Sequence, residues 1–174
     1  TLKRSALIPI VQTKMDGERV SIYNEDAKKD RPVSGVLLNN TSNLTLEGGS
    51  MTVLDHDSYA GGALMERLKP KEKRLISFAV DLGTLVTVKT EEIRQPAKLV
   101  KAFNGTFQIH YFKESKKIYA FTNQTDRVKT IYIEHPIRDG WILSDETAKP
   151  FDTTQNNYRF RFELQPFEDK TFTI

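Results

Sequence analysis

The most reactive side chains to stand together in this 174-residue chain are Asp55, His56 and Asp57. Successive side chains of a strand point to opposite faces, so Asp55 and Asp57 would share a face and His56 would point away. Two carboxylates on one face could bind a hard cation such as Ca²⁺. The alternative is a loop after a strand, in which the aspartates accept backbone N–H bonds in Asx turns. No Asp-x-Asp-x-Asp-Gly loop supports the calcium site.

A second cluster comprises Glu134, His135 and Pro136, followed by residues 138–141 (RDGW). Glu134 could orient His135, and Arg138 could hold an anion through two hydrogen bonds. The alternative is that residues 135–136 end a strand and residues 139–140 form a turn that leads into Trp141. Proline favours an extended conformation in the residue before it, which suits this role.

The three histidines, His56, His110 and His135, belong to separate predicted strands, so a zinc site would require them to converge. Asp55, Asp57 and His135 are the weak candidates for a metal-assisted hydrolase, but we expect no metal site. The chain has no cysteine, no G-x-S-x-G motif and no glycine-rich phosphate loop. The sequence therefore predicts no catalytic residue and no cofactor, although a pair of acids for glycoside cleavage stays open.

Alternation of apolar and polar residues, clearest over residues 106–134, predicts the elements that position these groups. Asn104-Gly105 between two such runs favours a two-residue hairpin turn. We expect Trp141 to lie between sheets, and most of the 17 aromatic residues to line a core. The pattern indicates an all-β fold, an antiparallel β-sandwich whose second half is immunoglobulin-like. The predicted strands are 6–12, 19–23, 35–39, 51–55, 63–66, 74–80, 84–90, 99–103, 106–112, 118–122, 130–134, 141–143, 158–164 and 171–174.

The polar stretch at residues 91–98 (EEIRQPAK) is the best candidate for a domain boundary. It predicts a β-rich subdomain over residues 1–92 and a sandwich subdomain over 93–174, with a single continuous β domain as the alternative. The net charge of +3 comes from interspersed signs, and the basic run at 69–74 contains Glu72, so we expect no nucleic-acid partner. No apolar run of about 18 residues predicts a membrane span. The start at Thr1, without an apolar leader, favours a domain of a longer or processed chain.

Several stretches resemble a bacterial domain family of unknown function, number 4139, best known as the C-terminal part of mucoidy-inhibitor-A-like proteins. The chain departs from the family pattern at Lys71, where the family has glycine, and at Pro166-Phe167, where it has Pro-Gly. The resemblance implies a β fold and an exported bacterial context, periplasmic or at the cell surface, and it transfers no catalytic residue. The stretches are residues 51–62 (MTVLDHDSYAGG), 68–75 (LKPKEKRL), 80–83 (VDLG), 133–141 (IEHPIRDGW) and 158–167 (YRFRFELQPF).

The function expected from these observations is a non-catalytic structural or interaction module of a larger exported bacterial protein. Its partners would be neighbouring domains of the same polypeptide, or other proteins, reached through sheet edges or loop ends. The alternative is a β-sandwich that binds a carbohydrate or another ligand, with aromatic residues on an outer face.

Overall fold

The computed structural model describes residues 11–27, 29–94, 99–103, 105–110 and 113–174. These residues form strands, turns and loops, and no helix occurs among them, so none of the described segments is a helix that could cross a membrane. The all-β class is confirmed. The strands are β1 (Asp16–Tyr23), β2 (Val33–Asn39), β3 (Gly49–Asp55), β4 (Ser58–Met65), β5 (Lys73–Val80), β6 (Thr84–Arg94), β7 (Leu99–Phe103), β8 (Thr106–His110), β9 (Lys113–Asn123), β10 (Lys129–Pro136), β11 (Asp152–Thr153), β12 (Asn157–Leu164) and β13 (Asp169–Thr173).

The chain divides into two compact units, and their bounds differ from the predicted subdomains 1–92 and 93–174. Unit 1 holds the described residues up to Val20 together with Ser34–Ala79. Unit 2 holds Ser21–Val33 and the described residues of Val80–Ile174. Residues 92 and 93 lie inside strand β6, because the polar residues there form a ladder with the start of β9.

Unit 1 contains the β3–β4 hairpin and most of β2 and β5. Gly61 of β4 has a φ of +152°, and a Cβ atom built on it would lie 2.2 Å from the backbone oxygen of Phe78 in β5. Only glycine permits the two backbones to approach this closely. Strand β4 begins at Ser58, five residues before the predicted start at residue 63, because the hairpin turn after β3 takes up only two residues.

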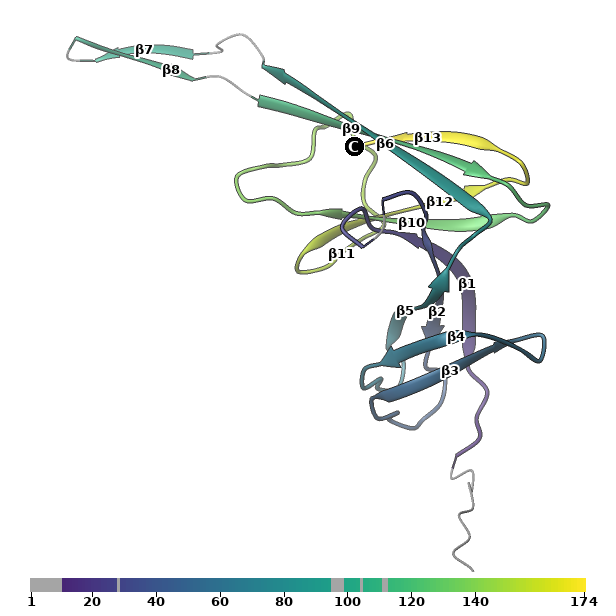
Figure 1. Cartoon of the computed structure of the whole chain (residues 1–174). Helices are drawn as coiled ribbons and strands as arrows, with labels where there is room; N and C mark the ends of the chain where they lie inside the picture. The colour runs from purple at the N-terminus through teal and green to yellow at the C-terminus, as the bar shows by residue number, and fades with distance from the viewer. Residues whose placement is uncertain (1–10, 28, 95–98, 104, 111–112) are drawn as a thin grey trace, which may run out of the picture. The chain divides into compact units, whose positions relative to one another are not determined.

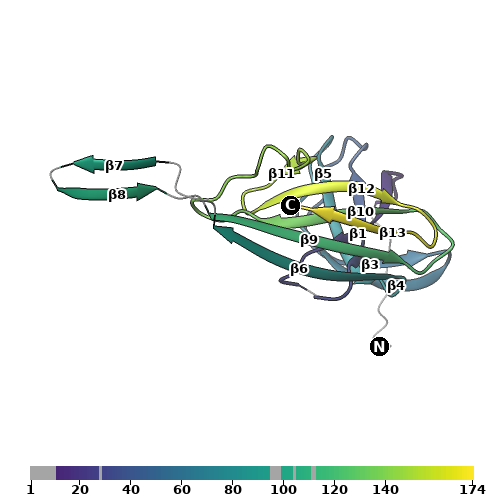
Figure 2. The same ribbon diagram turned by 90° about the horizontal axis from the view of Figure 1, so that it is seen from above.

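Unit 2 is a sandwich of two sheets, which Figure 1 shows as two layers. One sheet has the order β13-β9-β6, and Figure 2 shows these strands side by side. The other contains β11-β12-β10 and the end of β1. The end of β1 pairs with β10 in parallel, an exception to the predicted antiparallel order. This pairing is possible because more than a hundred residues separate β1 from β10, so no tight turn dictates their direction.

The core of unit 2 lies between its two sheets and is largely aromatic and β-branched. On β12, Phe160 and Leu164 are buried while Arg161 and Glu163 are exposed, as the two-residue alternation predicts. The predicted aromatic core and the β-sandwich are therefore confirmed, whereas the immunoglobulin-like topology stays a prediction. The buried cluster consists of Tyr23, Val86, Tyr119, Phe121, Ile131, Ile133, Phe160 and Leu164.

The segment between β10 and β11 contradicts the predicted strand at 141–143. The amide of Trp141 donates to the oxygen of Arg138 in a turn, in which Gly140 has a φ of +76°. The turn leads Trp141 into a loop instead of a strand, and Trp141 is absent from the buried cluster of unit 2. The predicted position of Trp141 between the sheets is therefore wrong.

Three further predictions fall partly outside the described residues. Most of the predicted strand 6–12 lies there, and the described residues 11 and 12 are not in a strand. Asn104 also lies outside, but Phe103 pairs with Thr106 and Gly105 has a φ of +75°, so the connection between β7 and β8 has the predicted two residues. The end of the predicted strand 106–112, at residues 111 and 112, is not described either.

A candidate binding groove beside strand β9

The predicted triplet of Asp55, His56 and Asp57 forms the end of β3 and the turn to β4. His56 and Asp57 have φ angles of +48° and +62°, the conformation of a two-residue hairpin turn, so Asp57 does not share a strand face with Asp55. Asp55 accepts a hydrogen bond from Arg19 at 2.6 Å, and its other oxygen lies 2.9 Å from Nδ1 of His56. The positive charge of Arg19 lowers the pKa of Asp55. The Asp55 carboxylate is thus engaged in an exposed ion pair.

The three weak candidates for metal ligands belong to different units of the chain. Asp55 and Asp57 belong to unit 1 and His135 belongs to unit 2. Within the residues that the structure describes, no group of three histidine, aspartate or glutamate side chains is arranged to hold a metal ion. His110 lies on β8, where the structure describes the backbone pairing alone.

His135 and Glu134 of β10 do not act on each other, because neighbouring side chains of a strand point to opposite faces. Glu134 accepts hydrogen bonds from Asn24, at 3.3 Å, and from Arg159, at 3.0 Å. The proposed orientation of His135 by Glu134 is therefore wrong. The Nδ1 atom of His135 lies 2.9 Å from the hydroxyl oxygen of Tyr119 instead.

His135 is a neutral hydrogen-bonding group at pH 7. Burial, followed by the charges of Lys117 and Arg138, lowers its pKa to about 4. Burial also raises the pKa of Tyr119, so the tyrosine keeps its proton and can donate it to Nδ1. We assign the remaining ring hydrogen to Nε2 on this ground. Lys117, whose ammonium group is paired with Glu25, is itself almost buried.

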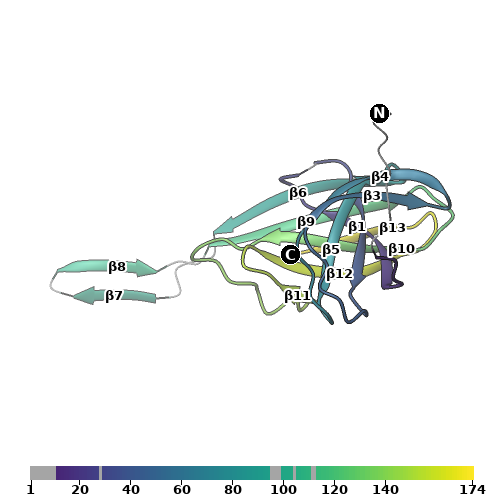
Figure 3. The ribbon, with the colours of Figure 1, turned by 90° about the horizontal axis from the view of Figure 1, so that it is seen from below.

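A groove of about 630 Å³ opens beside His135, on the side of unit 2 where β9 begins. Its walls are the first five residues of β9, the ends of β10 and β13, the loop from Trp141 to Thr147 and Tyr158 of β12. Figure 3 shows the sheet of β10 and β12 from below, together with the segment that connects β10 to β11. A groove of this volume has the size of small-molecule and peptide sites.

The groove combines apolar surface with charge. The ammonium of Lys113 lies 5.8 Å from the ring centroid of Trp141 and 2.8 Å from the carboxylate of Glu92. Leu143 and Tyr158 line the groove and also pack against the core. Its charged side chains are four cations, Lys113, Lys116, Lys117 and Arg138, and three anions, Glu114, Asp145 and Glu146.

Among these residues, the sequence singled out His135, Arg138 and Trp141 but missed the start of β9. Residues 113–117 (KESKK) read as a polar stretch before an alternating run, with nothing to mark them as part of a binding site. Their place in the groove wall depends on the pairing of β9 with β6 and β13, which joins residues far apart in the sequence.

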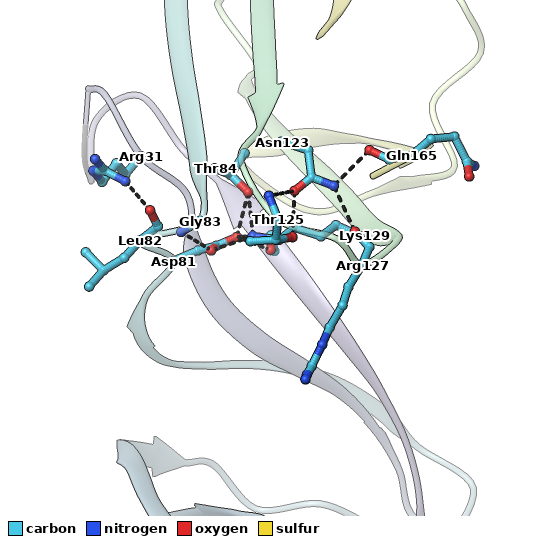
Figure 4. Close-up of polar contacts among 11 residues, drawn as sticks. Arg31, Asp81, Leu82, Gly83, Thr84, Asn123, Thr125, Arg127, Lys129 and Gln165 are labelled. Carbon is cyan, nitrogen blue, oxygen red and sulfur yellow. Dashed lines mark hydrogen bonds and ion pairs between the residues drawn. The ribbon is translucent and has the colours of Figure 1, made fainter. Parts of the chain in front are cut away.

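A second polar cluster, shown in Figure 4, is buried in unit 2 around Asp81. The carboxylate accepts hydrogen bonds from Ser21 at 2.7 Å, Thr84 at 2.8 Å and the amide of Gly83 at 2.9 Å. The ammonium of Lys129 contacts both carboxylate oxygens, at 2.7 and 2.9 Å. Burial alone would raise the pKa of Asp81, but these hydrogen bonds and the charge of Lys129 hold it below its ordinary value.

The Asp81 cluster is tightly enclosed. A Cβ atom on Gly83 would lie 2.4 Å from the methyl group of Thr125 and 2.8 Å from the ammonium of Lys129. Nearby, the side-chain amide of Asn123 donates to the backbone oxygens of Arg127 and Gln165, both at 2.8 Å. With its carboxylate engaged by four neighbours, Asp81 holds strands and turns together.

In comparisons with known proteins, no protein-family model, curated protein or solved structure matches the chain.

Proposed function

We propose that the chain is a non-catalytic interaction module of a larger exported bacterial protein, and that it binds its partner in the groove beside β9. The observation that carries the proposal is the composition of that groove. Trp141, Leu143 and Tyr158 offer apolar surface, while Arg138 and the neutral His135 offer hydrogen-bond donors within the same 630 Å³. Apolar walls with a few polar groups are typical of binding sites.

The protonation and pairing of the ionisable groups in the groove support a binding role and not a catalytic one. His135 keeps a low pKa and uses Nδ1 for the contact with Tyr119. Lys117 is held by Glu25. These contacts fix the groups in place, as a binding surface requires. The exported bacterial context and the neighbouring-domain partners are supported by the family resemblance of the sequence, and the two-sheet packing of unit 2 is compatible with an immunoglobulin-like topology.

A carbohydrate is the second candidate for the ligand. Trp141 and Tyr158 both line the groove, and aromatic rings beside polar side chains provide the stacking and hydrogen bonds that sugar rings need. This candidate differs from the first in the nature of the partner and not in the site.

The experiment is an NMR titration of the isotope-labelled chain with two probes, a pool of random hexapeptides and a set of neutral and acidic oligosaccharides. We expect one probe class to shift the resonances of Ser115, His135 and the Trp141 indole. Trp141→Ala should weaken that binding, whereas Phe167→Ala, which removes an exposed aromatic ring from the turn between β12 and β13, should not. Binding that leaves these resonances unchanged, or probes found cleaved by mass spectrometry, would refute the proposal.

A further inference from the structure

Unit 1 contains a buried asparagine that ties the end of β2 to two other backbone segments. The side-chain amide of Asn40 donates to the backbone oxygens of Leu44, at 2.8 Å, and Leu68, at 3.1 Å. Its side-chain oxygen accepts hydrogen bonds from the amide and the hydroxyl of Ser42, at 3.1 and 2.6 Å. Asn40 is 0% exposed, so these contacts satisfy an amide group that water does not reach.

Unit 2 contains the same arrangement at the end of β9. The side-chain amide of Asn123 donates to the backbone oxygens of Arg127 and Gln165, both at 2.8 Å (Figure 4). Its side-chain oxygen accepts hydrogen bonds from the amide and the hydroxyl of Thr125, at 3.0 and 2.8 Å. In both units the asparagine therefore binds the hydroxyl residue two positions ahead, the backbone oxygen four positions ahead and a distant turn.

The distant turns also share one design. They have the sequence pattern Leu-x-Pro-x-Glu, at residues 68–72 (LKPKE) and 164–168 (LQPFE). The glutamate carboxylate accepts a hydrogen bond from the amide three positions earlier, at 2.8 Å in the first turn and 2.6 Å in the second. The residue before the glutamate has a φ of +67° in the first turn and +55° in the second. The asparagine amides donate to the backbone oxygens of Glu72 and Glu168, both at 2.9 Å.

The strands around each asparagine follow the same order. In unit 1, β2 lies between β1 and β5, while β3 and β4 form a hairpin. In unit 2, β9 lies between β6 and β13, while β10 pairs with β12. Unit 2 adds the β7–β8 hairpin before β9 and a long connection before β12. In chain order, strands β1, β2, β3, β4 and β5 thus correspond to β6, β9, β10, β12 and β13.

We propose that the two units are copies of one five-stranded module, and that residues 138–155 are an insertion in the second copy that contacts an apolar side chain of a peptide partner. The repeat stands on the matched contacts and strand order alone. The role of the insertion rests on the proposed function, because it takes the groove beside β9 as the binding site.

The insertion interrupts a hairpin that is otherwise continuous. In unit 1, β3 and β4 pair up to Asp55 and Ser58, and a turn of two residues joins them. In unit 2, the ladder of β10 and β12 is continued by Ile137, whose amide donates to the oxygen of Asn156 at 2.8 Å. The chain therefore leaves the hairpin after Ile137 and returns to it at Asn156.

The insertion supplies one wall of the groove. That wall consists of Arg138 and residues 141–147 (WILSDET). Ile142 lies beside Trp141 in this wall, and its side chain is 91% exposed. An isoleucine in that position adds little to the core of unit 2, but it offers apolar surface at the mouth of a groove. Because its side chain has no hydrogen-bonding group, it suits an apolar side chain of a peptide better than a sugar hydroxyl.

The first test replaces residues 138–155 of the full chain by Asn-Gly, the pair that two-residue hairpin turns prefer. We expect unit 2 to stay folded, so hydrogen exchange of the β9 and β12 amides should stay within about tenfold of the wild-type rate. The pool of random hexapeptides should no longer shift the resonances of Ser115. Loss of protection throughout unit 2 would show that the segment belongs to the module itself, and would overturn the insertion.

A point variant tests the peptide contact without removing the segment. Ile142→Ser should weaken binding of the tightest-binding hexapeptide of the pool about tenfold, since it removes an apolar contact. The matched control is Leu82→Ser, which removes a side chain of unit 2 that is 74% exposed and lies outside the groove wall. It should change the Kd by less than about twofold. Equal effects of the two substitutions would overturn the contact.

Asparagine variants test the repeat itself. Asn40→Asp and Asn123→Asp each replace a buried donor by an oxygen that faces two backbone oxygens. Each should accelerate hydrogen exchange of the amides in its own unit by at least about tenfold. Asn43→Asp, at an exposed position, should leave the exchange rates unchanged. A large effect in one unit and none in the other would show that the two asparagines are not equivalent, and would overturn the repeat.

The outcomes separate this inference from the proposed function. If oligosaccharides shift the groove resonances and hexapeptides do not, the proposed function stands and the peptide contact is wrong. If neither probe class shifts them, the proposed function and the contact are both wrong, whereas the repeat is decided by the asparagine variants.

Discussion

Replacing Asp81 by asparagine should strongly destabilise unit 2, because it breaks the buried ion pair with Lys129. The side chain of Asp81 is buried, and it accepts hydrogen bonds from Ser21 Oγ and from the amide of Gly83. It also neutralises Lys129, whose side chain is 15% exposed. Asp81→Asn keeps the shape of the side chain but leaves this ammonium without a counter-charge.

The expected cost follows from the burial of that charge. Removing one partner of a buried ion pair costs about 3–5 kcal/mol, because the remaining charge is left uncompensated. Replacing both partners, with Asp81→Asn and Lys129→Met together, removes the buried charge and should reduce the cost below about 2 kcal/mol. The double variant should therefore be more stable than the single variant, which is an unusual direction for an added mutation.

The assay is urea unfolding followed by the fluorescence of Trp141, the single tryptophan of the chain, which belongs to unit 2. The pH dependence adds a check. The pKa of Asp81 is lowered in the folded chain, so its contribution is present above the unfolded value of 3.8 and is lost as the pH falls through the folded value. The wild type and Asp81→Asn should therefore converge below that pH. A cost of less than about 1 kcal/mol at pH 7, or a double variant less stable than the single one, would refute the reasoning.

Two further predictions concern His135 and Gly61. The pKa of His135 is about 4 in the folded chain and 6.5 in the unfolded chain, so between these pH values only the unfolded state binds the extra proton. The free energy of unfolding should therefore fall by about 2–3 kcal/mol as the pH drops from 6.5 to 4. Urea unfolding across this range should show a smaller drop for His135→Gln and an unchanged drop for His56→Gln; an unchanged drop for His135→Gln would contradict the assignment. Gly61→Ala should destabilise unit 1 by more than about 2 kcal/mol, since the new methyl group meets the Phe78 backbone. Hydrogen exchange of the β3–β4 amides should accelerate in Gly61→Ala but not in Gly62→Ala, whose methyl group has ordinary contacts, and equal exchange in the two variants would count against the clash.

The strands of this fold could be predicted from the sequence because the alternation of apolar and polar residues that defines a strand lies within a short segment. A strand with one wet face and one dry face shows its alternation directly, as β12 does with Phe160 and Arg161. The extent of a strand is less local. Strands β6 and β9 continue into the polar residues 91–94 and 113–117 because they pair with each other there, and pairing partners are invisible in a single run of sequence.

The candidate site was predicted only in part for the same reason. Arg138, His135 and Trp141 carry side chains that suggest chemistry, so the sequence pointed to them, although it assigned His135 the wrong neighbour. Ser115 lines the groove because β9 pairs with β6 and β13, and this pairing leaves no compositional signal. Asp81 likewise depends on contacts with Ser21 and Lys129, 60 and 48 residues away in the chain.

The chemical shifts of the groove residues test the central claim most directly. Ser115, His135 and Trp141 all line the groove beside β9. Titration with the hexapeptide pool and the oligosaccharides should shift the resonances of these residues for one probe class, and Trp141→Ala should weaken that binding. Binding that leaves these resonances unchanged would contradict the account.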